Sequence, residues 1–302
     1  MRKKHSARQN HPEKSRLYHV EEQTTLLPFL LKVMSRRGRN SVKSILTRGQ
    51  VAVDGEAVTA HNHKLEPGQT VTKLKNKVAA RESKLTGLSI LYEDKDVIVI
   101  NKDAGLLSIA SQKEKEMTAY RQLMTHVRRE NPRDRIFIVH RLDRDTSGVM
   151  LFAKSERVKQ ILQKSWTDMV QERAYVALVE GVVKKEAGTI SSWLKETKTH
   201  KMYSSFKPND GQHAVTHYKK IQANQQLSLL EVHLETGRKN QIRVHMQDIG
   251  HSIVGDKKYG ASINPIRRLG LHARTLAFTH PTTKEPMRFK AGIPQAFLAK
   301  SN

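Results

Sequence analysis

The 302-residue chain has no cysteine, few aromatic residues, few acidic residues and no long apolar run. The absence of cysteine excludes disulfides, thiolate metal sites and cysteine nucleophiles, and it fits a protein of the cytosol. No apolar run approaches the length that spans a bilayer, and the polar, basic N-terminus lacks the apolar core of a signal peptide. We therefore expect a soluble, cytoplasmic protein with no membrane partner.

What the chain has in excess is positive charge. It contains 54 lysines and arginines against 29 aspartates and glutamates, which gives a net charge of +25 at pH 7. A field of this sign and size attracts polyanions. Nucleic acid fits better than an anionic membrane surface, because the sequence shows no basic amphipathic anchor and no lipidation signal. The length suggests two domains, or one large domain and a small one.

The N-terminal part of the chain divides into three expected segments. Residues 1–22 are basic and hold few large apolar side chains, so we expect a flexible arm that either contacts RNA or is simply solvated. Residues 23–77 show two helical patterns, followed by a strand–turn–strand with Asp54-Gly55 at its turn. Residues 78–88 are polar and charged, which is typical of a linker.

The segment 23–77 resembles the S4 RNA-binding module, a small α/β domain with two short helices, a basic junction and a hairpin. The resemblance implies RNA contacts through basic residues near the helix junction and the hairpin: Arg36, Arg37, Arg39, Lys43, Arg48 and Lys64. The alternative is a solvated face of a small helical subdomain. The large positive charge of the chain favours RNA binding.

In the region 89–302, strand patterns outnumber helical patterns and do not alternate regularly with them. This favours an α+β fold with a mixed, mostly antiparallel sheet over a doubly wound sheet. The most charged loop, residues 140–148, stands between apolar runs that are typical of buried strands. Loops held by buried strands often carry chemistry.

Two aspartates of this loop, Asp143 and Asp145, are expected to need partners, because a charge beside a core is costly unless it is paired. Arg141 and Arg144 are the nearest candidates along the chain, and Thr146-Ser147-Gly148 supplies turn residues. Asp145-Thr146-Ser147-Gly148 also reads like the signature of aspartic proteases, which need two carboxylates sharing a proton. The signature occurs once, so a protease would have to dimerise around Asp145.

The histidines show no HExxH pair and no spacing of a helical metal site, so we expect no metal; those considered are His140, His245, His251, His272 and His280. A carboxylate with an arginine and an aromatic ring fits the charge of the chain better. Asp143 would be a nucleophile or base, Arg243 would pair with it and orient it, and Tyr175 would stack on a flat substrate. Such a set suits chemistry on a nucleobase turned out of its stack.

Four motifs stand in the order found in a known family: residues 90–106, 140–148, 174–181, and 236–245 with 255–260. Together they resemble the RluA-type pseudouridine synthases over about residues 89–295, and an S4 module in front is common there. The resemblance implies isomerisation of uridine to pseudouridine in RNA, without cofactor or metal. Ribosomal RNA is the expected partner, because an S4 module suggests a structured RNA, and a monomer is expected.

The resemblance also implies roles for single residues. Asp143 would be the nucleophile or base that breaks the glycosidic bond, Arg243 would pair with it, and Tyr175 would stack on the base and assist late proton removal. Arg141 would help to hold the target nucleotide out of its helix, and Arg238 would also bind the RNA. Asp145 is then expected to be structural.

One departure from the family pattern is Asp103, which stands where these enzymes usually have proline. We expect it to alter a loop near the site without changing the chemistry, and it leaves substrate specificity open. The alternative function is a non-catalytic S4-type RNA-binding protein associated with ribosomal RNA. The intact set Asp143, Tyr175 and Arg243 favours the enzyme, because a binding protein has no need of a carboxylate facing a phosphate-rich partner.

Overall fold

The computed structural model of the protein describes residues 17–35, 37–47, 49–74, 85–111, 114, 116–129 and 131–302. The chain forms two compact units, divided after Lys84, and each is described by itself. Among the described residues, no helix is both long enough and apolar enough to cross a membrane.

The N-terminal unit combines two helices with short antiparallel strands. The helices are α1 (Leu26–Val33) and α2 (Arg39–Thr47). One sheet has the order β1 (Leu17–His19), β6 (Thr70–Lys73), β3 (Val51–Val53) and β4 (Glu56–Ala57), and β2 (Thr24–Thr25) pairs with β5 (Lys64–Leu65). Apolar side chains of both helices and of β3 and β6 form its core. The expected helices and the hairpin at Asp54-Gly55 are present, whereas the resemblance to an S4 module stays a prediction.

The expected boundaries of this unit need correction. The flexible arm was expected to reach residue 22, but residues 17–19 form β1 and pair with β6, and residues 1–16 lie outside the described part. The linker was expected to reach residue 88, but the side-chain amide of Gln122 bonds both backbone groups of Thr86. These contacts come from distant segments, so the local polar composition conceals them.

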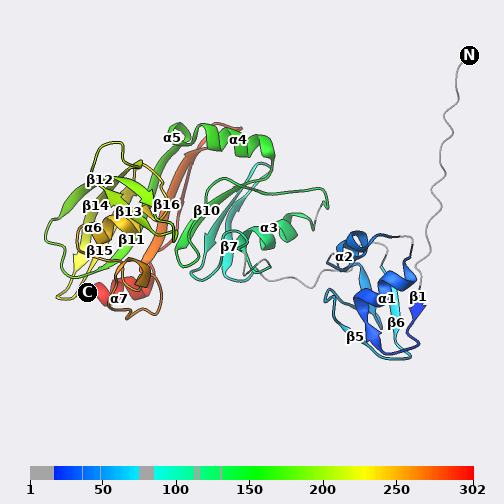
Figure 1. Ribbon diagram of the computed structural model, residues 1–302. Coiled ribbons are helices and arrows are strands. Elements are labelled where there is room, and N and C mark those ends of the chain that lie inside the picture. The colour runs from blue at the N-terminus through cyan, green and yellow to red at the C-terminus, as the bar shows by residue number, and fades with distance from the viewer. Residues whose placement is uncertain are drawn as a thin grey trace, which may run out of the picture. The chain divides into compact units, whose positions relative to one another are not determined.

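The second unit is built on one large sheet. Its strands are β7 (Leu88–Glu93), β8 (Val97–Lys102), β9 (Phe137–Ile138), β10 (Ser147–Ala153), β11 (Val170–Glu180), β12 (Ala187–Glu196), β13 (Met202–Ser205), β14 (Gln212–Ala223), β15 (Leu227–Leu234), β16 (Leu271–Thr279) and β17 (Pro286–Lys290). The order is β13-β12-β14-β15-β11-β16-β10-β8-β7, with β9 beside β10 and β17 beside β16 (Figure 1). Among the described strands, β10 and β16 run parallel and their neighbours pair antiparallel. The expected α+β class with a mostly antiparallel sheet is confirmed.

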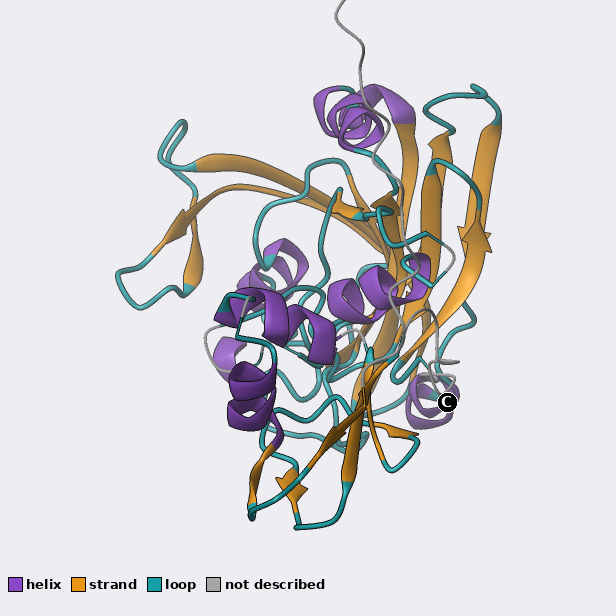
Figure 2. Ribbon diagram, turned by 90° about the vertical axis from the view of Figure 1, so that its right-hand side faces the viewer, coloured by secondary structure: helices purple, strands orange, loops and turns teal. Residues whose placement is uncertain are grey.

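Helices cover the twisted sheet in separate places (Figure 2). They are α3 (Ala119–Val127), α4 (Glu156–Lys164), α5 (Trp166–Met169), α6 (Gln241–Asp248), a single turn η1 (Lys257–Tyr259) and α7 (Gln295–Ser301). α3 packs on β8 and β10, and α6 packs on β11 and β15, which gives two apolar clusters. Tyr175 on β11 packs against both clusters. It therefore marks the place where the two halves of the core meet.

The loop that carries Asp143 ends where β10 begins, at a close contact between β10 and β16. Thr146-Ser147-Gly148 was expected to form a turn, but Ser147 and Gly148 already belong to β10. Gly148 has a φ of 115°, and a Cβ at this position would overlap the carbonyl oxygen of Ala273 on β16. Glycine is therefore required here by the contact between two strands, and not by a turn.

Candidate active site

The Asp143 loop is held from both sides by the segment that follows β8. The carbonyl before Asp143 accepts a hydrogen bond from Ser108 Oγ at 2.7 Å. On the other side of Asp143, the carbonyl of Arg144 accepts hydrogen bonds from the buried Lys102 Nζ at 3.0 Å and from the backbone N–H of Gly105 at 2.9 Å. Because both flanking carbonyls are fixed, the backbone that carries Asp143 is fixed as well.

The same segment accounts for the departure at Asp103. The backbone N–H of Asp103 donates to the carbonyl of Gly87 at 2.8 Å. Proline has no N–H and could not form this bond. The change therefore ties the loop to the chain before β7, and the Asp103 side chain is exposed.

Asp143 receives two hydrogen bonds on one oxygen atom. Arg243 Nη1 lies 2.9 Å from Asp143 Oδ2, and Asn240 Nδ2 lies 2.6 Å from the same atom. Among the described residues no donor bonds Oδ1, while about a third of the side chain (32%) is exposed. One oxygen is thus fixed to the protein, and the other is available to a ligand.

Arg243 is itself held by a second carboxylate. Its Nε and Nη2 donate to the two oxygens of Asp256 at 2.6 and 2.8 Å, and the Asp256 side chain is 1% exposed. The guanidinium also lies over the ring of Tyr259, 4.9 Å from the ring centre. Burial alone would lower the pKa of Arg243, but the hydrogen bonds and charges of Asp256 and Asp143 outweigh burial and raise it. Arg243 is a permanent cation that bridges two carboxylates.

A small pocket of about 80 Å³ lies over Asp143 and is lined by Tyr175, Arg141 and Arg238 among other residues. Tyr175 is half-buried, and burial raises the pKa of its hydroxyl, which keeps it neutral. Arg141 and Arg238 are exposed, and Arg238 Nε donates to the carbonyl of His213 at 2.9 Å. The pocket thus combines an available carboxylate oxygen, a ring and two cations at its rim.

Comparisons with known proteins fit this arrangement. Residues 96–248 match the family described as RNA pseudouridylate synthase. The chain is 36% identical over 273 residues to an uncharacterised RNA pseudouridine synthase of Bacillus subtilis, YlyB, covering 88% of this chain and 89% of that protein. The chain belongs to the RNA pseudouridylate synthase family.

Two further similarities extend over most of this pseudouridine synthase. Ribosomal large subunit pseudouridine synthase D of Vibrio cholerae is 33% identical over 273 residues, covering 85% of this chain and 83% of the relative. The solved structure of human RNA pseudouridylate synthase domain containing 1 has a TM-score of 0.56 and 26% identity, covering 69% of this chain and 84% of that one. The resemblance to RluA-type synthases is thus confirmed at the level of the family.

The structure of the synthase pairs Asp143 with Arg243, as expected. Arg141, the nearer candidate along the chain, is not its partner, and Asn240 is a second partner that was not expected; both partners stand about a hundred residues away in the sequence. Asp145 does pair with Arg144, at 3.1 Å, and its side chain is 48% exposed. An exposed carboxylate with an arginine beside it is not half of an aspartic protease dyad.

The predicted RNA-binding residues of the N-terminal unit differ in exposure. Arg37, Arg39 and Lys64 are exposed, and Lys43 is half-buried. Arg36 and Arg48 lie outside the described residues. Their role in RNA binding stays a prediction.

Two residues of the site escaped the sequence analysis. Asn240 and Asp256 both stand inside the last of the four motifs, 236–245 with 255–260, but neither was given a role. Asp256 follows the apolar Val254 and Gly255, and a carboxylate next to a core residue is a signal that a cation lies nearby. Three histidines, in contrast, are packed into the core: burial lowers the pKa of each to about 4, for His140, His245 and His272.

Proposed function

We propose that the protein converts specific uridines of large-subunit ribosomal RNA into pseudouridine, with Asp143 as the nucleophile or base. In this reaction the bond between N1 of uracil and C1′ of ribose breaks, and a bond between C5 and C1′ forms. The hydrogen leaves C5, and N1 ends protonated. The composition of the nucleotide is unchanged, so the reaction takes no oxidant, reductant or group donor.

The arrangement of Asp143, Arg243 and Asp256 carries this proposal. An ionised carboxylate in a partly closed pocket needs a fixed cation, and Arg243 is fixed by the buried Asp256. The ring of Tyr175 beside Asp143 offers a stacking surface to a uracil turned out of its helix. In this proposal Arg141, which is exposed at the rim, helps to hold that nucleotide out of its helix.

The choice of RNA rests on charge and on a relative. The name of the Vibrio cholerae relative says that it acts on the large ribosomal subunit. The net charge of +25 favours a large polyanion. In this proposal the N-terminal unit is an S4-like RNA-binding domain whose contacts include Arg37, Arg39 and Lys43, and the enzyme is a cytoplasmic monomer.

The test is pseudouridine mapping in ribosomal RNA from cells that lack the protein, with add-back of wild type, Asp143→Asn and Asp145→Asn. We expect at least one site to be lost and to be restored by wild type and by Asp145→Asn, the neighbouring exposed aspartate. Asp143→Asn should restore nothing but still bind the RNA. Unchanged ribosomal RNA would refute this substrate, and full activity of Asp143→Asn would refute the role of Asp143. RNA binding by a wild type that modifies no RNA would point to the non-catalytic alternative.

A further inference from the structure

We propose that Asn240 is a positioning residue that fixes the plane of the Asp143 carboxylate, so that one oxygen stays bound to the protein and the other faces the target uridine. The inference rests on the proposed role of Asp143. Asn240 is not a catalytic residue in this account, because it acts through Asp143 and needs no contact with the RNA. Its contribution is to hold the reacting carboxylate at one torsion angle about its Cβ–Cγ bond.

The backbone of Asn240 is suited to this task. The residue directly precedes α6 and has a left-handed conformation, with φ 53° and ψ 21°. Asparagine adopts this conformation more readily than most residues. Asparagine is also a favoured helix cap, but here its side chain makes no capping bond to α6. The amide is therefore free to reach across to Asp143.

A relay of hydrogen bonds fixes the orientation of the amide. The backbone N–H of Met202 donates to the hydroxyl of Tyr259 at 3.1 Å, and that hydroxyl donates to Asn240 Oδ1 at 3.1 Å. Tyr259 is fully buried, and burial raises the pKa of its hydroxyl, so the hydroxyl keeps its proton. With Oδ1 taken by a donor, the amide must present Nδ2 to Asp143, at 2.6 Å.

The consequence concerns the two oxygens of Asp143. Asn240 and Arg243 both donate to Oδ2, from directions set by the start and the first turn of α6. With two donors on one oxygen, a partial rotation of the carboxylate plane would weaken both bonds. Arg243 alone would allow a wider range of torsion angles, because one donor restricts the plane from one direction only. Asn240 therefore narrows this range and keeps the second oxygen directed away from both donors.

The test compares variants that keep the left-handed backbone. Asn240→Gly removes the amide and tolerates positive φ. Asn209→Gly is the matched control, since Asn209 has φ 60° and is exposed. The substrate is ribosomal RNA labelled with tritium at C5 of uridine, taken from cells lacking the protein, because pseudouridine formation releases that hydrogen. We expect Asn240→Gly to lower kcat by about 10- to 100-fold, the factor for one hydrogen bond to a charged group, with KM and RNA affinity nearly unchanged. Asn209→Gly should match wild type.

The pH profile gives a second, independent measurement. Asn240→Asp has the same shape but places a carboxylate against Asp143, and two such carboxylates tend to share a proton. Its activity relative to wild type should fall as the pH rises from about 5 to 8, because the shared proton is then lost. A purely structural role for Asn240 predicts a constant ratio. Tyr259→Phe, which frees the amide to turn, should show a smaller loss in kcat than Asn240→Gly.

These results separate the inference from the function on which it rests. A wild-type kcat for Asn240→Gly, beside an active wild type and an inactive Asp143→Asn, would overturn the positioning role alone. A pH-independent ratio for Asn240→Asp would overturn it too, even if Asn240→Gly failed to fold. If wild type itself released no tritium from any RNA, the proposed function would fail first. A lower kcat at unchanged KM, together with the pH-dependent ratio, supports the inference.

Discussion

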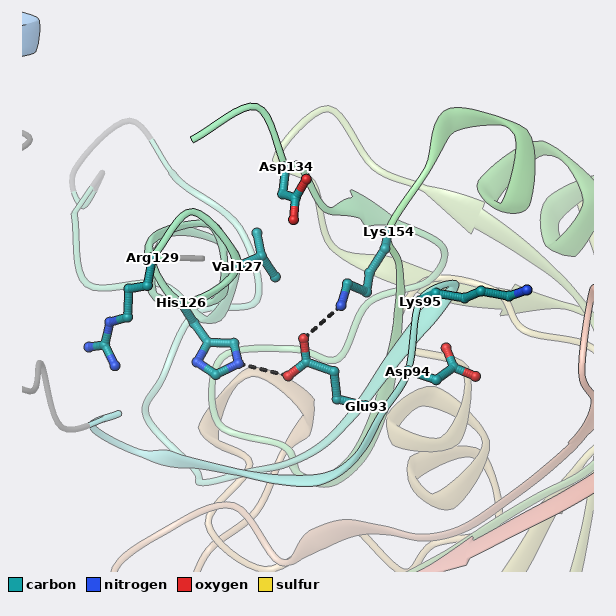
Figure 3. Close-up of a pocket in the computed structure, with 8 residues that line it drawn as sticks. All are labelled: Glu93, Asp94, Lys95, His126, Val127, Arg129, Asp134 and Lys154. Atoms are coloured by element: carbon teal, nitrogen blue, oxygen red, sulfur yellow. Dashed lines mark hydrogen bonds and ion pairs between the residues drawn. The ribbon is translucent and has the colours of Figure 1, made fainter. Parts of the chain in front are cut away.

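Two pockets of the second unit each contain a carboxylate held between nitrogen groups, and the two carboxylates differ in which of their oxygens are bonded. Glu93 lies in a cleft of about 550 Å³, with Oε1 2.8 Å from Lys154 Nζ and Oε2 2.7 Å from His126 Nε2 (Figure 3). Asp143 lies in a pocket of about 80 Å³, and both of its partners bond Oδ2. In the larger cleft, both oxygens of Glu93 have a nitrogen partner. In the smaller pocket, only one oxygen of Asp143 has such partners among the described residues.

In the proposed function, the difference separates a structural ion pair from the pair that holds the reacting carboxylate. Glu93 joins the end of α3 to β10 through His126 and Lys154, which fastens the helix to the sheet. The nearby Lys95 and Arg129 point away from Glu93 (Figure 3). Around Asp143, in contrast, every contact fixes one side of the carboxylate and leaves the other open. The number of free oxygens, and not the size of the cavity, distinguishes the two places.

Among variants that keep both Asp143 and Glu93, the largest effect is expected from Asp256→Asn. This change leaves Arg243 with one carboxylate partner in place of two, and the freed guanidinium can shift onto both oxygens of Asp143. We expect kcat to fall about 100-fold, and the free energy of unfolding to fall by about 3 kcal/mol, as for a broken buried ion pair. Single-turnover kinetics and urea denaturation measure the two quantities. Wild-type turnover in this variant would contradict the bridging role of Arg243.

A smaller effect is expected from Lys102→Met, which tests how the Asp143 loop is held. Lys102 Nζ donates to the carbonyls of Asp103, Leu106 and Arg144, which would then be left without this donor. We expect the free energy of unfolding to fall by about 2 kcal/mol at pH 7. Removal of the Glu93 charge should leave the hydrogen bonds of the Asp143 loop unchanged, because Glu93 does not contact that loop in the described chain.

The lowered pKa of Lys102 predicts how the free energy of unfolding changes with pH. Burial lowers the pKa of Lys102 from 10.5 to about 8. Between these values the folded protein has lost a proton that the unfolded chain still binds, so raising the pH stabilises the folded state. The stability difference between wild type and Lys102→Met should therefore grow from pH 8 to pH 10.5. A difference that is constant over this range would show that Lys102 keeps its charge when buried.

The features of the fold and of the site that depend on local sequence patterns could be predicted from the sequence. Strand and helix patterns indicated the two helices and the hairpin of the N-terminal unit and the mostly antiparallel sheet of the second unit, and the resemblance to a known family implied the pairing of Arg243 with Asp143. The positions that escaped prediction depend on contacts between distant segments. Asn240 lies 97 residues from Asp143, and its left-handed backbone is not visible in local composition. Gly148 looked like a turn residue because its contact with β16 comes from the far end of the chain.

A moderate effect is expected from Arg238→Gln, measured as the salt dependence of RNA affinity. Arg238 lies exposed at the rim of the Asp143 pocket, where a phosphate of the bound RNA would pass. Removing one phosphate contact should reduce the slope of log affinity against log salt by about 1. Lys95→Gln is the matched control, since Lys95 is exposed at the Glu93 cleft. Equal slopes of log affinity against log salt for the two variants would contradict a specific phosphate contact at Arg238.

The smallest effect is expected from Glu93→Gln, which should leave kcat and KM at wild-type values. Although burial opposes its charge, the hydrogen bonds of Lys154 and His126 lower the pKa of Glu93 below its ordinary 4.5. A lowered pKa stabilises the folded state above pH 4.5, and this stabilisation is lost as the pH falls through the folded-state value. The variant should therefore be less stable than wild type by about 1 kcal/mol at pH 7, with a gap that closes in acid. A fall in kcat without a fall in stability would place Glu93 in the reaction, and the contrast between the two carboxylates would then be lost.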